Sequence, residues 1–88
     1  MDEDQKRRRE IILKVVENQI RDNDPPETRQ TLARLIKDGF SREKAVELIG
    51  TVVVHELYNV LKQNENFDRK RFTAALRQLP KLPYDKDS

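Results

Sequence analysis

The chain has 88 residues, 39% of them charged, and its formal net charge is only +2. A chain of this length is expected to form one domain, and without cysteine it has neither a disulfide frame nor a thiolate metal site. The net charge is too small to require a polyanionic partner. No apolar run reaches the ~18 residues of a membrane span, and the amino terminus lacks the apolar core of a signal peptide, so we expect a cytoplasmic protein.

The first predicted helix covers residues 3–22. Its apolar residues recur at spacings of three and four, the period of one helical face: Ile12, Val15, Val16 and Ile20. The charged run at residues 6–9 has two interpretations, a nucleic-acid-binding arm or a solvated helical face. An acid precedes a base by four residues in four pairs: Glu3–Arg7, Asp4–Arg8, Glu10–Lys14 and Glu17–Arg21. Since each such pair stabilises an exposed helix by ~0.2–0.5 kcal/mol, the pattern favours the solvated face.

The second predicted helix covers residues 25–38. Asp24 is expected to cap its amino terminus, and Pro25 suits the first helical position, where no backbone donor is needed. Gly39 is expected to end the helix in the left-handed conformation, with Phe40 packing back onto it. The acidic residues before this helix also suggest the start of a calcium loop, but no glycine follows where the tight turn needs one, which disfavours calcium.

The third predicted helix covers residues 42–63 and is capped by Ser41. Its apolar arc is wide: Ala45, Leu48, Ile49, Val52, Val53, Leu57, Val60 and Leu61. A helix this apolar needs neighbours on more than one side. We therefore expect it to be the longest helix and the centre of a bundle.

The fourth predicted helix covers residues 69–79, with Asp68 as its cap. Phe67 precedes the cap, where it can contact Phe72 in the next turn. Prolines follow the helix, and residues 82–88 are predicted to be a flexible tail. The pattern as a whole predicts an all-α, compact four-helix bundle formed by one domain, residues 1–81.

Four short motifs occur in order along the chain: Glu17-Asn18-Gln19-Ile20, Asp24-Pro25-Pro26-Glu27, Gly39-Phe40 and Phe67-Asp68. Over roughly residues 12–80 they resemble a small bacterial all-helical family of unknown function, found as short proteins and as appended modules. The resemblance implies a helical bundle without established activity. It also implies that relatives carry histidines near the positions of Arg9, Leu13, Glu43 and Glu47, where two pairs spaced by four residues suit a metal. This chain has none of those histidines, so neither a metal nor a cofactor is carried over.

No set of residues in the chain forms a convincing catalytic constellation. The two glycines are far apart and form no phosphate loop, and there is no cysteine nucleophile. His55 is the only histidine, and we interpret it as structural rather than as a general base. Glu43 and Glu47 lie four apart on one helix, and without further ligands they are expected to be an exposed pair. The sequence therefore predicts no enzyme and no catalytic, cofactor-binding or metal-binding residues.

Basic residues concentrate near the carboxyl end, where residues 67–88 carry six bases and three acids, a local charge of +3. The stripe on and after the last helix comprises Arg69, Lys70, Arg71, Arg77 and Lys81. A row of cations along one helix suits phosphate contacts, so these are the candidate nucleic-acid contacts. The chain offers few aromatic residues for base stacking, which weighs against this hypothesis.

Three helices each carry one long polar side chain among apolar positions: Gln19 on the first, Arg29 on the second and Glu56 on the third. A buried charge must be paired and hydrogen-bonded. We therefore predict a structural cluster in which Arg29 and Glu56 form an ion pair assisted by Gln19.

The absence of catalytic chemistry in the sequence leads to a functional hypothesis of surface recognition. We expect a non-catalytic protein-interaction or accessory module whose partner is another protein, with Val54, Tyr58 and Tyr84 on the contact surface. The alternative is nucleic-acid binding through the carboxyl-terminal basic stripe.

Overall fold

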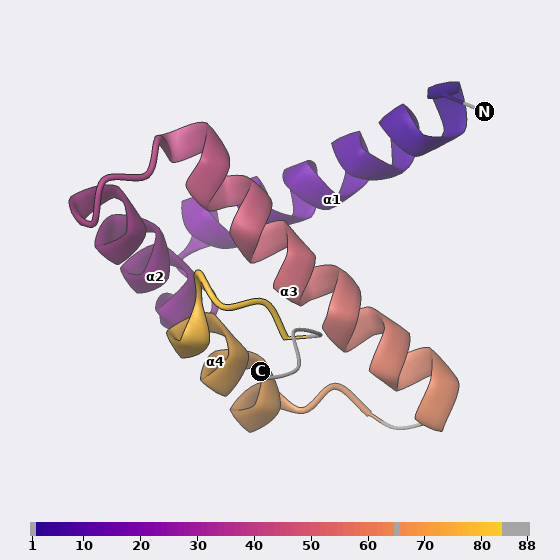
Figure 1. Cartoon of the computed structure of the whole chain (residues 1–88). Coiled ribbons are helices and arrows are strands. Elements are labelled where there is room, and N and C mark those ends of the chain that lie inside the picture. Colours follow the sequence, from indigo (N-terminus) through magenta and orange to yellow (C-terminus); the bar gives the residue numbers. More distant parts are fainter. Residues whose placement is uncertain (1, 65, 84–88) are drawn as a thin grey trace.

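The computed structural model describes residues 2–64 and 66–83, which form four helices and no strand (Figure 1). The helices are α1 (Asp2–Asp22), α2 (Pro26–Lys37), α3 (Arg42–Gln63) and α4 (Arg69–Gln78). The predicted all-α, four-helix architecture is confirmed, and α3 is longest, at 22 residues against 21 for α1.

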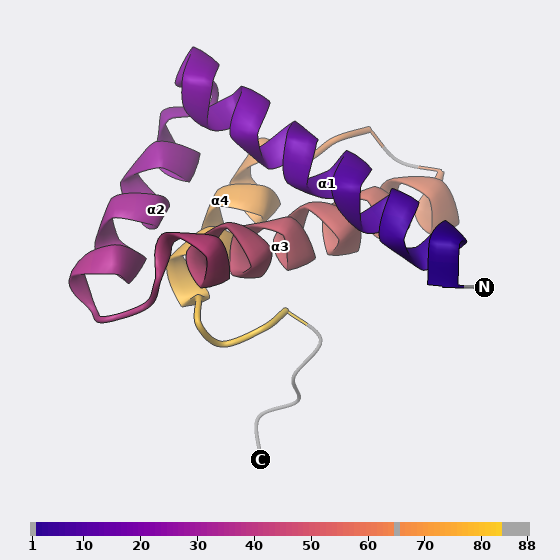
Figure 2. The ribbon, with the colours of Figure 1, turned by 90° about the horizontal axis from the view of Figure 1, so that it is seen from above.

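Helix α3 is the central element of the bundle. It contacts each of the other three helices, whereas α1 and α4 make no contact with each other within the described residues. Figure 2 shows α1 and α3 lying one above the other, with α2 beside their ends. In the described part of the chain, eleven apolar side chains are buried: Val16, Leu32, Leu35, Ala45, Val46, Leu48, Ile49, Val52, Phe72, Leu76 and Leu79. Five of them belong to α3 and lie between Ala45 and Val52, so the core lies against the amino-terminal and central turns of that helix.

The carboxyl-terminal half of α3 differs from the expected apolar arc. Leu57 and Leu61 were placed on the buried side by periodicity, yet both are exposed. In Figure 1 this half of α3 and the amino-terminal half of α1 diverge from the point where the two helices cross. The helical period identifies an apolar face correctly, but here no neighbouring helix extends far enough to cover it.

Local sequence signals determine most helix ends. The Ser41 hydroxyl accepts a bond from the Lys44 amide at 3.0 Å, and the Asp68 carboxylate accepts one from the Arg71 amide at 3.0 Å, as the caps predict. Gly39 has φ +108°, a conformation in which an L side chain is strained, and the following amide bonds to the Leu35 carbonyl at 3.0 Å.

The expected start of the second helix and the expected start of the tail both need correction. Helix α2 begins at Pro26 with Pro25 as its cap residue, so the expected side-chain cap from Asp24 does not form. Leu82, assigned to the flexible tail, is half-buried and packs against the core. Residues 84–88 of that tail, including Tyr84, lie outside the described residues.

The amino-terminal half of α1 is solvent-exposed from Asp2 to Ile11. None of the four predicted acid–base pairs within this helix forms an ion pair among the described residues, and only Glu17 and Arg21 have other ionic partners, Arg42 and Asp22. Arg9 pairs with Glu47 on α3, and Glu17 accepts two bonds from Arg42 at 2.8 and 2.9 Å. These ion pairs connect α1 to α3.

Candidate interaction surface

Among residues 2–64 and 66–83, Glu56 is the one buried carboxylate, with a side chain only 5% exposed. Arg71 donates to both of its oxygens, from Nε to Oε1 and from Nη2 to Oε2, each at 2.8 Å. The backbone amide of Asp68 donates to Oε2 at 3.1 Å. The Arg71 guanidinium holds the pKa of Glu56 below its ordinary value against the opposing effect of burial, and the Asp68 amide lowers it further.

The predicted ion pair between Arg29 and Glu56 is wrong, although Glu56 is buried as expected. Arg29 is exposed and donates to the Ile20 carbonyl at 2.6 and 3.2 Å and to the Arg21 carbonyl at 3.3 Å, at the end of α1. Gln19 instead accepts a bond from the Thr28 hydroxyl at 2.9 Å. The three polar residues therefore support separate junctions between helices and form no common site.

Arg71 had been assigned to the basic stripe, so its pairing with Glu56 also changes the candidate nucleic-acid surface. Arg69, a second member, lies 3.5 Å from a carboxylate oxygen of Glu27. Lys70, Arg77 and Lys81 are exposed. Two of the five stripe cations thus face carboxylates of the chain itself, which leaves a weaker positive surface than the sequence suggests.

The remaining titratable residues form no reactive cluster. His55 is half-buried, with Nδ1 at 3.4 Å from the Asn59 amide nitrogen. Glu43 is exposed, and Glu47 is paired with Arg9. Within residues 2–64 and 66–83, no group of three or more His, Cys, Asp or Glu side chains could hold a metal ion.

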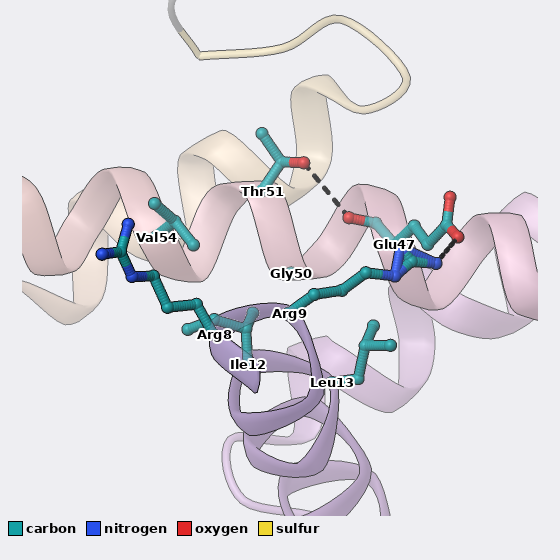
Figure 3. Close-up of a pocket in the computed structure, with 8 residues that line it drawn as sticks. All are labelled: Arg8, Arg9, Ile12, Leu13, Glu47, Gly50, Thr51 and Val54. Carbon is teal, nitrogen blue, oxygen red and sulfur yellow. Dashed lines mark hydrogen bonds and ion pairs between the residues drawn. The ribbon is translucent and has the colours of Figure 1, made fainter. Parts of the chain in front are cut away.

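A hollow of about 330 Å³ lies where α1 crosses α3 (Figure 3). Gly50 permits the close approach, since a Cβ built there would lie 3.1 Å from a methyl of Ile12. Figure 3 shows Arg8 and Arg9 diverging on either side of this contact. Arg9 extends to Glu47, whereas Arg8 reaches toward Val54 and forms no ion pair or hydrogen bond with the described part of the chain.

Beyond the hollow, the outer half of α3 carries four exposed apolar side chains, which we call the α3 apolar face. Their exposed fractions are 47% for Val54, 50% for Leu57, 56% for Tyr58 and 75% for Leu61. The stretch from residue 51 to 61 contains a single charged residue, Glu56, and that one is buried. The surface of these three turns therefore carries no Asp, Glu, Lys or Arg side chain, in a chain of which 39% is charged.

A second apolar hollow, of about 200 Å³, lies beside this face. Leu57, Val60 and Phe67 line it together with Phe72, whose ring centroid is 5.5 Å from that of Phe67. The predicted contact between these two phenylalanines is confirmed, and both rings lie beside the outer half of α3. Sequence reasoning identified Val54 and Tyr58 as surface residues but placed Leu57 and Leu61 in the core.

Comparison with known proteins yields no relative: no protein-family model matches the chain, and neither the curated proteins nor the solved structures include a match. No helix of the described residues is long and apolar enough to cross a membrane.

Proposed function

We propose that this protein is a non-catalytic protein-interaction module that binds its partner through the α3 apolar face. The observation that carries the proposal is the composition of that face. Charged residues are depleted at the centres of protein interfaces, whereas aromatic and large apolar residues are enriched. Val54, Leu57, Tyr58 and Leu61 give α3 this composition over residues that the bundle itself leaves uncovered.

The nucleic-acid hypothesis has less support. Arg71, at the centre of the basic stripe, is committed to Glu56, and Arg69 lies near Glu27. The cations that remain are too few for the strong electrostatic attraction on which binding to phosphate backbones depends.

Site-specific photo-crosslinking tests the proposal in the cells that make the protein. A photoreactive amino acid in place of Leu57 or Leu61 is expected to give a discrete protein adduct, because both side chains point into solvent. The matched control carries the same amino acid in place of Lys37, an exposed position on α2. Equal labelling at Lys37 and at the two leucines, or no protein adduct at either leucine, would contradict the proposal.

A further inference from the structure

The α3 apolar face continues the line along which α1 packs on α3. At 100° per residue, Gly50, Val54, Leu57 and Leu61 fall within about 60° of arc. Ile12 of α1 covers this line at Gly50, and beyond that point α1 diverges from it (Figure 1). Together with Tyr58, which flanks the line, its uncovered residues have the i, i+3, i+4, i+7 spacing with which one helix receives another.

Cations flank the uncovered line at both ends. Arg8 reaches from α1 to the side of Val54 (Figure 3). The ammonium nitrogen of Lys62 lies 5.5 Å from the centre of the Tyr58 ring, at the other end of the face. The nearest acid on α3, Glu56, is buried and paired with Arg71. Among the described residues, this face is therefore bordered by Arg8 and Lys62 and by no exposed acid of the outer half of α3.

The same geometry disfavours a second copy of the chain as the occupant. If α3 packed antiparallel on its symmetry mate, Arg8 would approach Lys62 of the second copy, and in a parallel pair each cation would approach its own equivalent. The four side chains also expose on the order of 400 Å², about half of the ~800 Å² that each partner contributes to a stable complex of globular proteins.

We infer that the α3 apolar face docks a short amphipathic helix of another protein, whose apolar stripe packs on Val54, Leu57 and Leu61 and whose flanking carboxylates face Arg8. This inference rests on the proposed function and specifies the chemistry of the partner. The uncovered line from Val54 to Leu61 is about two helical turns long, so an apolar stripe of about two turns matches its length, and an acidic flank complements the two cations beside it.

The test uses two synthetic helical peptides of about four turns with leucines at the i, i+3, i+4, i+7 spacing. One carries glutamates along one flank, and the other carries lysines at the same positions. Binding to the full chain is measured by fluorescence anisotropy at low and high salt. We expect the glutamate peptide to bind at least tenfold more tightly than the lysine peptide at low salt, with the difference shrinking as salt screens the charges.

Two variants and one matched control locate the contacts. Leu57→Asp is expected to weaken the glutamate peptide at least tenfold, and Arg8→Glu is expected to reverse the preference between the peptides. Arg7→Glu makes the same charge change about 100° around α1 from Arg8 and should leave the preference intact. Far-UV circular dichroism and urea unfolding of each variant confirm that it is folded.

The contrary results distinguish a wrong charge preference, a wrong partner and the absence of helix docking. If both peptides bind equally, with Leu57→Asp abolishing both, the acidic specificity is overturned while binding by the face stands. If sedimentation shows a dimer that Leu57→Asp dissociates, the face is occupied by a second copy and the inference is overturned. If neither peptide binds, docking of amphipathic helices is overturned, and the photo-crosslinking result alone decides the proposed function.

Discussion

Removing either partner of the Glu56–Arg71 pair should cost unequal amounts of stability, because the two side chains are buried to different depths. The Glu56 side chain is 5% exposed and that of Arg71 is 35% exposed. Arg71→Met leaves a carboxylate without its cation in a dry site, which typically costs ~3–5 kcal/mol. Glu56→Met leaves a guanidinium that can turn to water, and mainly deprives the Asp68 amide of its acceptor, so we expect ~1–2 kcal/mol.

The double variant separates a specific pair from two independent losses. Replacing both partners by apolar residues of similar volume is often nearly neutral. The free energy of unfolding is measured by urea titration followed by circular dichroism. For the double variant it should be higher, by at least ~2 kcal/mol, than the value obtained by subtracting both single-variant losses from the wild type. The control pairs Glu56→Met with Arg29→Met, which should be additive because Arg29 bonds only to the end of α1. Additive losses for Glu56 and Arg71 would refute the pairing.

Low pH should remove the stability that the Glu56–Arg71 pair contributes. Because the folded pKa of Glu56 lies below its ordinary value of 4.5, the pair stabilises the fold fully above that value. The stabilisation is lost as pH falls through the lowered folded pKa. The stability difference between the wild type and Arg71→Met should therefore shrink below about pH 4.5, and a difference independent of pH would contradict the assignment.

Three further variants test the core, a glycine turn and a helix cap, and one binding assay tests the basic stripe. Ile49→Ala, at a fully buried position of α3, should cost ~2–5 kcal/mol in urea unfolding, and a loss below ~1 kcal/mol would contradict the central position of that side chain. Gly39→Ala places a side chain at φ +108° and should lower the unfolding free energy by about 1 kcal/mol despite the open space around it. Asp68→Ala removes the α4 cap and an acceptor for the Arg71 amide, for a loss of ~0.5–2 kcal/mol that Asp68→Asn should largely restore. In a salt titration with duplex and single-stranded DNA and RNA, the chain should show no sequence-independent binding at physiological salt, and a steep salt-dependent affinity would revive the basic-stripe hypothesis.

Most of the fold follows from local signals in the sequence. Periodicity located all four helices to within two residues, and the caps Ser41 and Asp68 form as expected. These features depend on residues within one turn of each other, which a single sequence records directly. The exposed outer half of α3 could not be found in this way, because the exposure of Leu57 and Leu61 depends on how far the neighbouring helices extend.

The pairing of the buried carboxylate of Glu56 likewise depends on how the helices pack, which the sequence pattern does not record. Glu56 is recognisable as a polar residue among apolar ones on α3, and it is indeed buried. Its partner depends on which helix end approaches it, and the sequence suggested Arg29 on α2. The contact between Phe67 and Phe72 was predictable because it lies within one segment of the chain, whereas the pairing of Arg71 with Glu56 depends on how α4 packs against α3.

The most direct test of the α3 apolar face as the binding surface is an amide chemical-shift map of the ¹⁵N-labelled chain titrated with the glutamate peptide. Saturable shifts should concentrate on residues 50–62 of α3 and on residues 8–12 of α1, which contribute the Arg8 rim and the contact at Gly50. Saturable shifts centred on α2 or α4, with residues 50–62 unchanged, would contradict the account.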